Sequence, residues 1–406
     1  MRPNPLTALL LLTALAVPAG AAVGPLSTEF RVNPTNDFRQ VNPVAAFAPS
    51  GAALVVWEND QAGIRGRFHN LRGVALGDQL TLVANQGLGG GREGEVRFRK
   101  EPAVAMLPNG HFLLAWTEER MFVKSYPYIE ERDVRDQDVL VQRFDARGRP
   151  DGDRFRVNAQ ETGLQSAPEL ALLANGNALV VWESKAGEGR TLVARPITRL
   201  GRPNGDEIVL SSHPEAGRAA VAAGRGGFLV TWDENGAGTG EVFGRLIGAS
   251  GQAQGAAFAV TFGIGSKRWS AVAAGADGNY LVAWHNTLER GVVHIYGQFL
   301  GAAGGFLGAP FQISGSTRSQ VAPALAAARS GFIATWRESF PSGLGIRAVE
   351  LDHLGARVGD EIEVTRTGVS KNYRTNIAAD GKGGFLVPWE TGFRGRRVIA
   401  ARSLGQ

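Results

Sequence analysis

Short apolar runs that end in tryptophan recur along this chain at a spacing of about fifty residues. Residues 175–182 read NGNALVVW, and residues 277–284 read DGNYLVAW. The tryptophans of the repeat are Trp57, Trp116, Trp182, Trp232, Trp284, Trp336 and Trp389. A fixed period of this length is typical of a repeat architecture, in which each repeat is one supersecondary unit.

Each repeat divides into four short strands. The first is rich in alanine, as in residues 219–223; the second ends in the tryptophan; residues 139–144 and 154–158 represent the third and the fourth. Asn-Gly, Asp-Gly and Gly-Gly pairs between the first two strands favour tight hairpins. Four antiparallel strands, repeated, form the blade of a β-propeller. The pattern therefore predicts an all-β fold, a seven-bladed β-propeller that forms one domain over residues 22–406.

The repeat starts and stops out of phase. A fourth-strand segment, residues 29–33, precedes the first tryptophan strand, and only residues 397–402 follow the last one. We expect these two segments to pair, so that the N-terminal strand completes the last blade and no sheet edge stays open in the ring. Pro388 lies inside the tryptophan strand of the last repeat and has no N–H to donate, so we expect a bulge or a missing bond there and the last blade to be the least regular.

The repeat resembles one found in large exported bacterial proteins. The resemblance is carried by Gln142, Arg143, Phe144, Asp145, Gly148, Phe155, Arg156, Val157 and Asn158, and more weakly by Gly297, Gln298 and Phe299. It covers nearly the whole chain after residue 21. It implies a propeller, but no particular activity, because that family is poorly characterised.

The N-terminal residues 1–21 have the pattern of a signal peptide. Arg2 is followed by an apolar segment, residues 6–17, and by small residues at 19–21. Such an apolar segment is too short to span a bilayer, and no later segment is apolar enough, so we expect no membrane span. The chain has no cysteine. This favours a bacterial protein that is secreted or periplasmic and large enough to bury its own core.

Charge narrows the expected partners. The net charge of +5 is a mild excess on a mixed surface, which does not indicate a nucleic-acid partner. We expect a monomer that binds an unknown protein or an anionic glycan. No metal-ligand spacing or Gly-rich phosphate loop is present, so neither a metal nor another cofactor is predicted.

Basic residues recur just before the first strand of most repeats. They are Arg39, Arg99, Lys100, Arg218, Lys267, Arg268, Arg318, Lys371 and Arg374. Aromatic residues lie among them, and Trp269 is the one tryptophan outside the repeat position. We expect the repeat tryptophans to be buried as packing residues between blades and Trp269 to be more exposed. Arg39, Arg268, Trp269, Arg318, Tyr373 and Arg374 are therefore the candidate ligand-binding residues at the mouth of the central channel. Guanidinium groups with aromatic platforms suit a carboxylate, a phosphate or an anionic sugar. The alternative is that these cations pair with acids in adjacent loops.

Two connections on the same face are longer than their counterparts, residues 84–101 and 117–138. The second carries Tyr126 and Tyr128, which we add to the ligand-binding candidates because long loops on a rigid scaffold often carry function. The alternative is a tolerated surface insertion.

Acids follow most of the repeat tryptophans. They are Glu58, Glu118, Glu183, Asp233, Glu234, Glu338 and Glu390. Paired carboxylates are the machinery of glycosidases. A second interpretation is structural pairing across the hairpin with third-strand arginines such as Arg67, Arg195, Arg245 and Arg402.

The sequence thus favours a non-enzymatic binding module, with its ligand or partner on the upper face near the channel mouth. The alternative is a carbohydrate-active hydrolase or lyase that uses upper-face arginines, tyrosine and acids. No catalytic residue is assigned, although Tyr373 and Asp37 are the candidates that an enzyme would use. Fold alone does not decide between the two classes.

Overall fold

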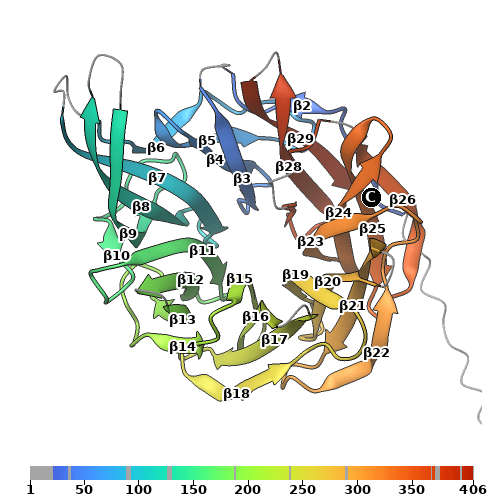
Figure 1. Cartoon of the computed structure of the whole chain (residues 1–406). Coiled ribbons are helices and arrows are strands. Elements are labelled where there is room, and N and C mark those ends of the chain that lie inside the picture. Colours follow the sequence, from blue (N-terminus) through green and yellow to red (C-terminus); the bar gives the residue numbers. More distant parts are fainter. Residues whose placement is uncertain are drawn as a thin grey trace, which may run out of the picture.

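The computed structural model describes residues 22–34, 38–87, 93–125, 130–186, 189–236, 239–288, 291–366, 368–370, 375–393 and 396–405. Within these ranges the protein is all-β, and none of the residues lies in an α-helix. The strands form a ring of twisted sheets around a central opening (Figure 1). The predicted all-β fold and propeller arrangement are confirmed.

The strands follow one another in groups of four along the chain. The first three groups are β3 (Gln40–Phe47), β4 (Ala53–Asn59), β5 (Gly63–His69), β6 (Leu80–Ala84), β7 (Glu93–Met106), β8 (Phe112–Ser125), β9 (Glu130–Phe144), β10 (Phe155–Arg156), β11 (Leu164–Leu172), β12 (Ala178–Ala186), β13 (Gly189–Ile197) and β14 (Ile208–Ser211). The next three are β15 (Ala216–Ala223), β16 (Gly227–Gly236), β17 (Thr239–Gly248), β18 (Ala253–Ala259), β19 (Ser266–Ala274), β20 (Tyr280–Thr287), β21 (Val293–Leu300), β22 (Phe306–Gln312), β23 (Gln320–Ala328), β24 (Gly331–Phe340), β25 (Gly343–Asp352) and β26 (Arg357–Thr365). The terminal group combines β27 (Ala378–Ala379), β28 (Gly384–Phe393) and β29 (Arg396–Gly405) with β1 (Gly24–Pro25) and β2 (Phe30–Arg31).

The described strands form six hydrogen-bonded sheets, where the repeat predicts seven separate blades. Four sheets have four strands each, the terminal sheet has five, and one sheet of eight strands combines β7–β10 with β11–β14. The two halves of the large sheet are joined by a single parallel pair, Leu164 with Gln137. The Gln137 N–H also donates to the Gly163 carbonyl oxygen at 3.1 Å. The join arises because β9 is long enough to run alongside the start of β11.

Both ends of the described chain meet in the terminal sheet. β2 pairs with β29 through Phe30–Ala401 and Arg31–Ala400, and β1 pairs with the same strand through Gly24–Gly405. The pairing expected between residues 29–33 and 397–402 is therefore present, over a ladder shorter than the sequence predicts. Val32 and Asn33, which follow β2, are fully buried.

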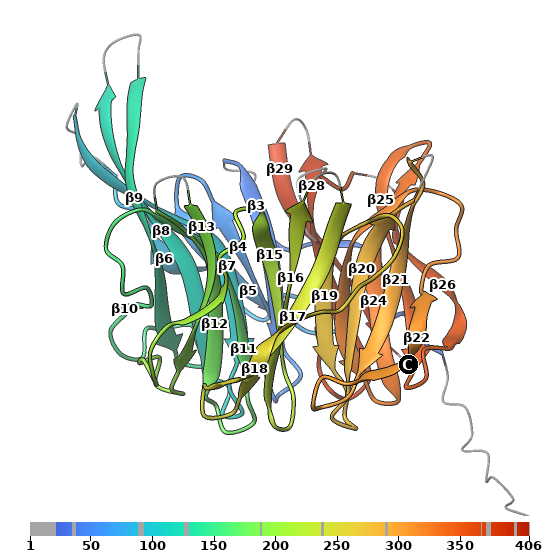
Figure 2. The same ribbon diagram turned by 60° about the horizontal axis from the view of Figure 1, so that its bottom comes forward.

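The two connections predicted as long loops are mainly strands. Residues 93–101 belong to β7, and residues 117–125 and 130–138 belong to β8 and β9. The β8–β9 hairpin projects well beyond the rest of the ring (Figure 2). A small apolar cluster of Val96, Met121 and Val123, with Phe98 against it, packs β7 against β8.

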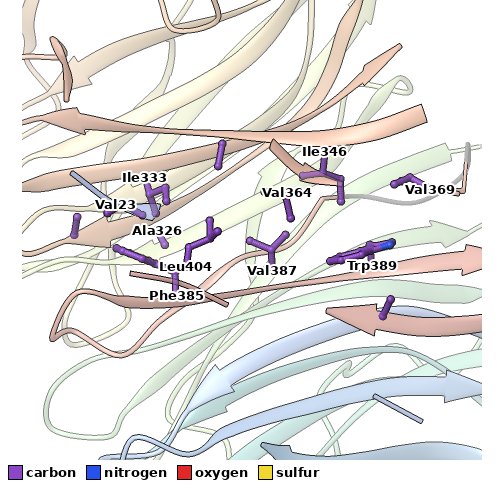
Figure 3. Packing of buried hydrophobic residues seen from close by; sticks show 13 residues of the cluster. Val23, Ala326, Ile333, Ile346, Val364, Val369, Phe385, Val387, Trp389 and Leu404 are labelled. Carbon is purple, nitrogen blue, oxygen red and sulfur yellow. The ribbon is translucent and has the colours of Figure 1, made fainter. Parts of the chain in front are cut away.

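The repeat tryptophans form the core between neighbouring sheets. Each is at most 3% exposed, whereas Trp269 is of intermediate burial, and both findings confirm the predicted difference. The indole N–H of Trp57 donates to Gln40 Oε1 at 2.7 Å, and that of Trp182 donates to Gln165 Oε1 at 3.0 Å. Figure 3 shows such a cluster, in which Trp389 and Val387 of β28 lie near Ile346 and Val364 of the preceding group.

Polar side chains join neighbouring groups as well. Arg195 donates to the Gly205 carbonyl of its own group and to the Val157 carbonyl of the preceding one. Arg67, Arg245 and Arg402 make bonds of the same kind to main-chain oxygens. The expected pairing across the hairpin is found for two third-strand arginines, Arg190 with Glu183 and Arg397 with Glu390. It is wrong for Arg67, Arg195, Arg245 and Arg402. Their planar forks instead bind carbonyl oxygens that the outer strands leave available.

The innermost strands contact one another in ring order, from β3 through β7, β11, β15, β19, β23 and β27 back to β3. All but β27 are interrupted by a bulge, where one residue has a φ between 52 and 58°. These bulge residues, called here the channel ring, are Asn42, Glu101, Ala167, Arg218, Trp269 and Ala322. A bulge bends the strand and re-aims the side chain, which here brings the ring residues to the central channel.

The terminal sheet is the least regular. β27 has two residues, and its ladder with β28 ends at the Ala378–Leu386 pair, before Pro388 is reached. Pro388 has no N–H to donate. On the other side, β28 pairs with β29 without a register shift through Pro388–Ala401. The irregularity that the sequence predicts at Pro388 is thus found only toward the channel.

Candidate functional site

The channel ring surrounds a cavity of about 550 Å³, called here the channel cavity. It is lined by the ring residues and by the first alanine-rich residues of the innermost strands. It opens on the side from which the β8–β9 hairpin projects, because the ring residue Glu101 lies between that hairpin and the alanine-rich half of β7. A volume of this size is within the range of small-ligand sites.

One side of the cavity is acidic. Glu101, Glu169 and Glu183 are the carboxylates of its lining. Glu101 Oε2 accepts from the Thr117 hydroxyl at 2.8 Å and from the Ala167 N–H at 2.8 Å. Glu183 Oε1 accepts from the Arg218 N–H at 2.9 Å, and its other oxygen lies 3.6 Å from Arg190 Nη1.

A hydrogen bond of the same kind recurs between neighbouring innermost strands and joins them. A side chain of one group accepts the N–H of the ring residue in the next group. Glu58 accepts from Glu101 at 3.2 Å, Glu183 accepts from Arg218, and His285 Nδ1 lies 3.5 Å from the Ala322 nitrogen. Burial raises the pKa of the Glu58 carboxyl, against the hydrogen bonds from Asn42 and Glu101 that lower it. The acid that follows the tryptophan is therefore structural in these groups.

The neighbouring part of the lining is formed by Arg218 of β15 and Trp269 of β19. Arg218 lies with its Cζ 4.9 Å from the centroid of the Trp269 ring, and Arg337 Cζ lies 5.6 Å from the same centroid. Arg218 Nη1 is 3.2 Å from Asp233 Oδ2, and Arg337 Nη1 donates to the Ser370 carbonyl at 3.1 Å. Stacking on an indole fixes the plane of a guanidinium and keeps its N–H edge available for hydrogen bonds.

His285 reports the charge of this region. Burial lowers its pKa to about 3, with further lowering by Arg268, Arg218 and Arg337. The imidazole is therefore neutral at ordinary pH. The name Trp269 cluster is used here for five residues: Arg218, Arg268, Trp269, His285 and Arg337.

The structure brings together only some of the predicted ligand-binding residues. Trp269 lines the channel cavity, whereas Arg39, Arg268 and Arg318 lie just before their ring positions and do not line it. Arg318 is paired with Glu338 at 3.3 Å, as the structural alternative expects. Arg268 Nε donates to Ser266 Oγ at 3.3 Å, and Arg39 is exposed. Five candidates lie outside the described residues: Tyr126, Tyr128, Tyr373, Arg374 and the enzyme candidate Asp37.

Arg218 was only one of the basic residues noted before the first strands, although the register of the repeats identifies it as a residue that lines the channel. Aligning the repeats on their first strands places Arg218 before AAV and Trp269 before SAV, in the same register as Asn42 before PVA. The channel ring follows directly from that register. The pairing of Arg218 with Asp233 depends on tertiary contacts and has no such signal.

Two absences apply to the described part of the chain alone. No group of three or more His, Cys, Asp and Glu residues there is placed to hold a metal ion. None of its helices could span a membrane.

Comparison with family models finds no match, and neither does comparison with curated proteins. Solved structures are similar in fold. A protein of unknown function from Dyadobacter fermentans DSM 18053 has a TM-score of 0.54 at 12% identity, covering 96% of this chain and 100% of that one. A PL25 polysaccharide lyase, an ulvan lyase bound to -[GlcA(1-4)Rha3S]-, has a TM-score of 0.52 at 12% identity, covering 93% and 95%. NanB with Optactamide has a TM-score of 0.51 at 8% identity, covering 78% and 67%. At these identities the likeness shows the fold alone, and that fold is a β-propeller.

Proposed function

We propose that this protein is an exported bacterial propeller of seven repeats that binds an acidic glycan in the channel cavity. The observation that carries the proposal is the stack of Arg218 on Trp269, two neighbouring members of the channel ring. In this proposal Arg218 binds the carboxylate of a uronic acid.

The conformation of Trp269 supports a role beyond packing. Its φ is 58°, a region in which a bulky residue is uncommon and strained. Asparagine, as at Asn42, tolerates the same bulge at less cost. A tryptophan that lines a polar cavity and stacks a half-exposed arginine fits a binding site better than it fits the core.

The two parts of the lining match the two kinds of group on an acidic sugar. A uronic acid has one carboxylate, which accepts hydrogen bonds, and several hydroxyls, which donate them. Arg218 supplies donors for the carboxylate, and its side chain is 38% exposed. Glu101, Glu169 and Glu183 supply acceptors for the hydroxyls. An inorganic anion such as sulfate has no hydroxyl to donate to these carboxylates, so the acidic part of the lining favours a sugar over an inorganic ion.

One of the similar structures holds an acidic glycan, the GlcA(1-4)Rha3S ligand of the ulvan lyase. That ligand belongs to the other protein, and we carry over only the class of compound. The resemblance of the propellers makes an acidic glycan the first class to test here.

Cleavage of the same glycan is the second candidate function, and the observation that favours it is that carboxylates and Arg218 line one cavity. A carboxylate can act as a general acid or base, and a guanidinium can stabilise the negative charge of a uronic acid during cleavage. Incubation with polyuronates, followed by assays for new reducing ends and for ultraviolet-absorbing unsaturated products, tests this candidate. Absence of both products over long incubation leaves binding as the function.

Calorimetry with glucuronate and galacturonate oligosaccharides tests the binding proposal. We expect Arg218→Gln to weaken binding by about tenfold or more, since a desolvated charge-assisted bond contributes about 1.5–3 kcal/mol. Arg218→Lys keeps the charge and loses the planar fork, so it should recover only part of the affinity. Arg202→Gln, an exposed change in another group, serves as the matched control.

Binding should also weaken as salt is added, because Arg218 is partly exposed. Equal binding of the neutral glucose oligosaccharides of the same length would refute the proposal. So would an Arg218→Gln protein with the wild-type affinity for the uronates.

A further inference from the structure

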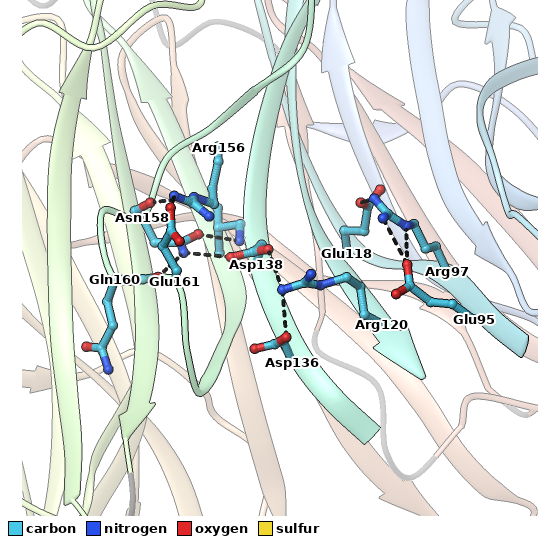
Figure 4. Close-up of polar contacts among 11 residues, drawn as sticks. Glu95, Arg97, Glu118, Arg120, Asp136, Asp138, Arg156, Asn158, Gln160 and Glu161 are labelled. Carbon is cyan, nitrogen blue, oxygen red and sulfur yellow. Dashed lines mark hydrogen bonds and ion pairs between the residues drawn. The ribbon is translucent and has the colours of Figure 1, made fainter. Parts of the chain in front are cut away.

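A second cavity lies away from the channel, across the upper part of the β7–β10 group. It has a volume of about 310 Å³, and its lining includes Arg97, Arg120, Arg154 and Arg156 together with Glu118 and Asp138. We call it the arginine groove. Figure 4 shows Arg156, Asp138, Arg120, Glu118 and Arg97 following one another across the strands.

The cations of the groove are accessible, whereas its acids are recessed. The four arginine side chains are between 30 and 43% exposed, and Glu118 and Asp138 are 6% and 14% exposed. At the rim, Glu95 pairs with Arg97 at 2.9 Å, Asp136 with Arg120 at 2.6 Å, and Glu161 with Arg156 at 2.6 Å. Exposed ion pairs such as those of Glu95 and Glu161 contribute little, so an anionic ligand can replace these two rim acids.

The recessed acids already have partners beneath the groove. Glu118 lies 2.8 Å from Nη2 of Arg99, a side chain that is 3% exposed. Asp138 Oδ1 accepts from Asn158 Nδ2 at 2.8 Å. Glu118 Oε1 also lies 3.2 Å from Arg97 Nη1, and Asp138 Oδ2 lies 3.9 Å from Arg120 Nη2, so the recessed acids are shared between the groove arginines and the residues beneath them.

Arg154 is the groove arginine with the weakest pairing. Its contact with Glu118 is long, at 3.6 Å, and its side chain is 43% exposed. A guanidinium has five N–H donors in a fork that matches an oxyanion.

The groove is long relative to a single anion. Arg97 is on β7 and Arg156 is on β10, three strand spacings away, which is about 14 Å at ~4.8 Å per spacing. Four guanidinium groups over that length exceed what one sulfate or phosphate ion can bind. The spacing suits a chain that carries repeated anionic groups.

We propose that the arginine groove binds sulfate or carboxylate groups of a polyanionic polysaccharide. This site is separate from the channel cavity, and the proposal does not depend on ligand binding there. A guanidinium pair on one anionic group, repeated along the groove, would hold the chain across the blade.

Equilibrium binding to dextran sulfate, polygalacturonate and neutral dextran tests this proposal, with sodium sulfate as the inorganic probe. The variant is the double change Arg154→Gln and Arg156→Gln, at two partly exposed side chains. Arg147→Gln with Arg149→Gln is the matched control, because it removes the same charge at the exposed β9–β10 turn of the same group. Arg218→Gln reports on the channel cavity.

We expect the wild type to bind at least one of the two anionic polymers and to lose affinity as salt is added. The groove double variant should bind about tenfold or more weakly, and the turn double variant should stay within about twofold of wild type. Arg218→Gln should retain the binding of dextran sulfate. Whether sulfate or carboxylate polymers bind more tightly identifies the group that is recognised.

Three results would overturn the proposal. The first is equal binding of neutral dextran, and the second is an equal loss in both double variants, which would mean attraction to the net charge alone. The third is binding of sodium sulfate with no gain from either polymer. A groove variant with an unchanged melting temperature keeps the comparison valid, since it separates lost binding from lost folding.

Discussion

His285 offers a direct test of the charge arrangement around the channel. Burial and three arginines lower its pKa to about 3, whereas an unfolded histidine has a pKa of about 6.5. The folded protein therefore excludes a proton that the unfolded chain takes up below pH 6.5. The stability that depends on this histidine is complete above that pH and is lost as the pH falls toward about 3.

The expected magnitude follows from the two pKa values. Each pH unit below the unfolded pKa costs 1.36 kcal/mol while the folded imidazole stays neutral, so the loss at about pH 5 is about 2 kcal/mol. His69 is similar, because burial lowers its pKa to about 4, with a smaller lowering by Arg67. It adds about 2 kcal/mol at the same pH. The wild type should thus lose about 4 kcal/mol from these two groups between neutral pH and pH 5.

Urea unfolding at about pH 7.5 and pH 5, followed by tryptophan fluorescence, measures this loss. In His285→Gln the loss should be smaller than in wild type by about 2 kcal/mol, whatever the stability of the variant at neutral pH. His353→Gln removes an exposed histidine and is the control, with the wild-type loss expected. If His285→Gln lost as much stability as wild type on acidification, the neutral imidazole among three arginines would be refuted.

Two other residues give predictions for stability. Asn158→Ala should lower the unfolding free energy by about 1–3 kcal/mol, because the Val139 N–H, which donates to Asn158 Oδ1 at 2.8 Å, would be left buried without a partner. Urea unfolding checks this, and an unchanged midpoint would contradict it. Burial raises the pKa of Glu58, so its ionisation destabilises the fold as the pH rises through 4.5 and above. Glu58→Gln should therefore gain stability relative to wild type at pH 7, and the gain should shrink toward pH 4; a gain that grows on acidification would show the opposite sign of the shift.

The fold could be predicted from the sequence where its cause is local. The alternation of apolar runs and turn residues specifies the strands, and the repeat tryptophans are buried as predicted because their position recurs in every unit. The Phe-x-Val-Asn ending also has a local cause. Asn33 and Asn158 each accept an N–H from the third strand of their own sheet, and Thr261 and Ser314 do the same in two other groups.

The differences from prediction arise in the β7–β14 sheet. One of the segments predicted as loops alternates in apolar and polar residues from Val96 to Phe98, which is a strand period, and the other has the apolar run Met121 to Val123. Many charges in these segments suggested loops instead. The strands that form are long enough for Gln137 to pair with Leu164, and this contact merges two sheets that the repeat treats as separate.

The sequence placed the candidate ligand-binding residues near the channel, but it did not identify which of them line the cavity. The expectation of cations before the innermost strand placed Arg39, Arg268 and Arg318 near the channel, but the bulge selects one residue per strand to line it. The register of the alanine-rich strands identifies that residue, as Arg218 and Trp269 show. Which acid neutralises which arginine, as in Asp233 with Arg218 and Glu338 with Arg318, depends on contacts between strands and could not be derived from spacing.

In the channel ring, the main chain joins neighbouring groups, whereas the side chains line the cavity. The backbone conformation of the ring is the same in six innermost strands, and its N–H groups are bound by side chains of the preceding group, such as Glu58, Glu183 and His285. Two ring side chains also take part in that joining: Glu101 binds the next N–H itself, and Asn42 donates to the Glu58 carboxylate at 3.0 Å. At Arg218 and Trp269, which line the cavity, we expect substitution to change the cavity more than the join between groups. The composition of the lining follows from which residue occupies each otherwise equivalent position, glutamate on β7, arginine on β15 and tryptophan on β19. Under the binding proposal, the fold therefore specifies the place of binding and the ring residues specify the ligand.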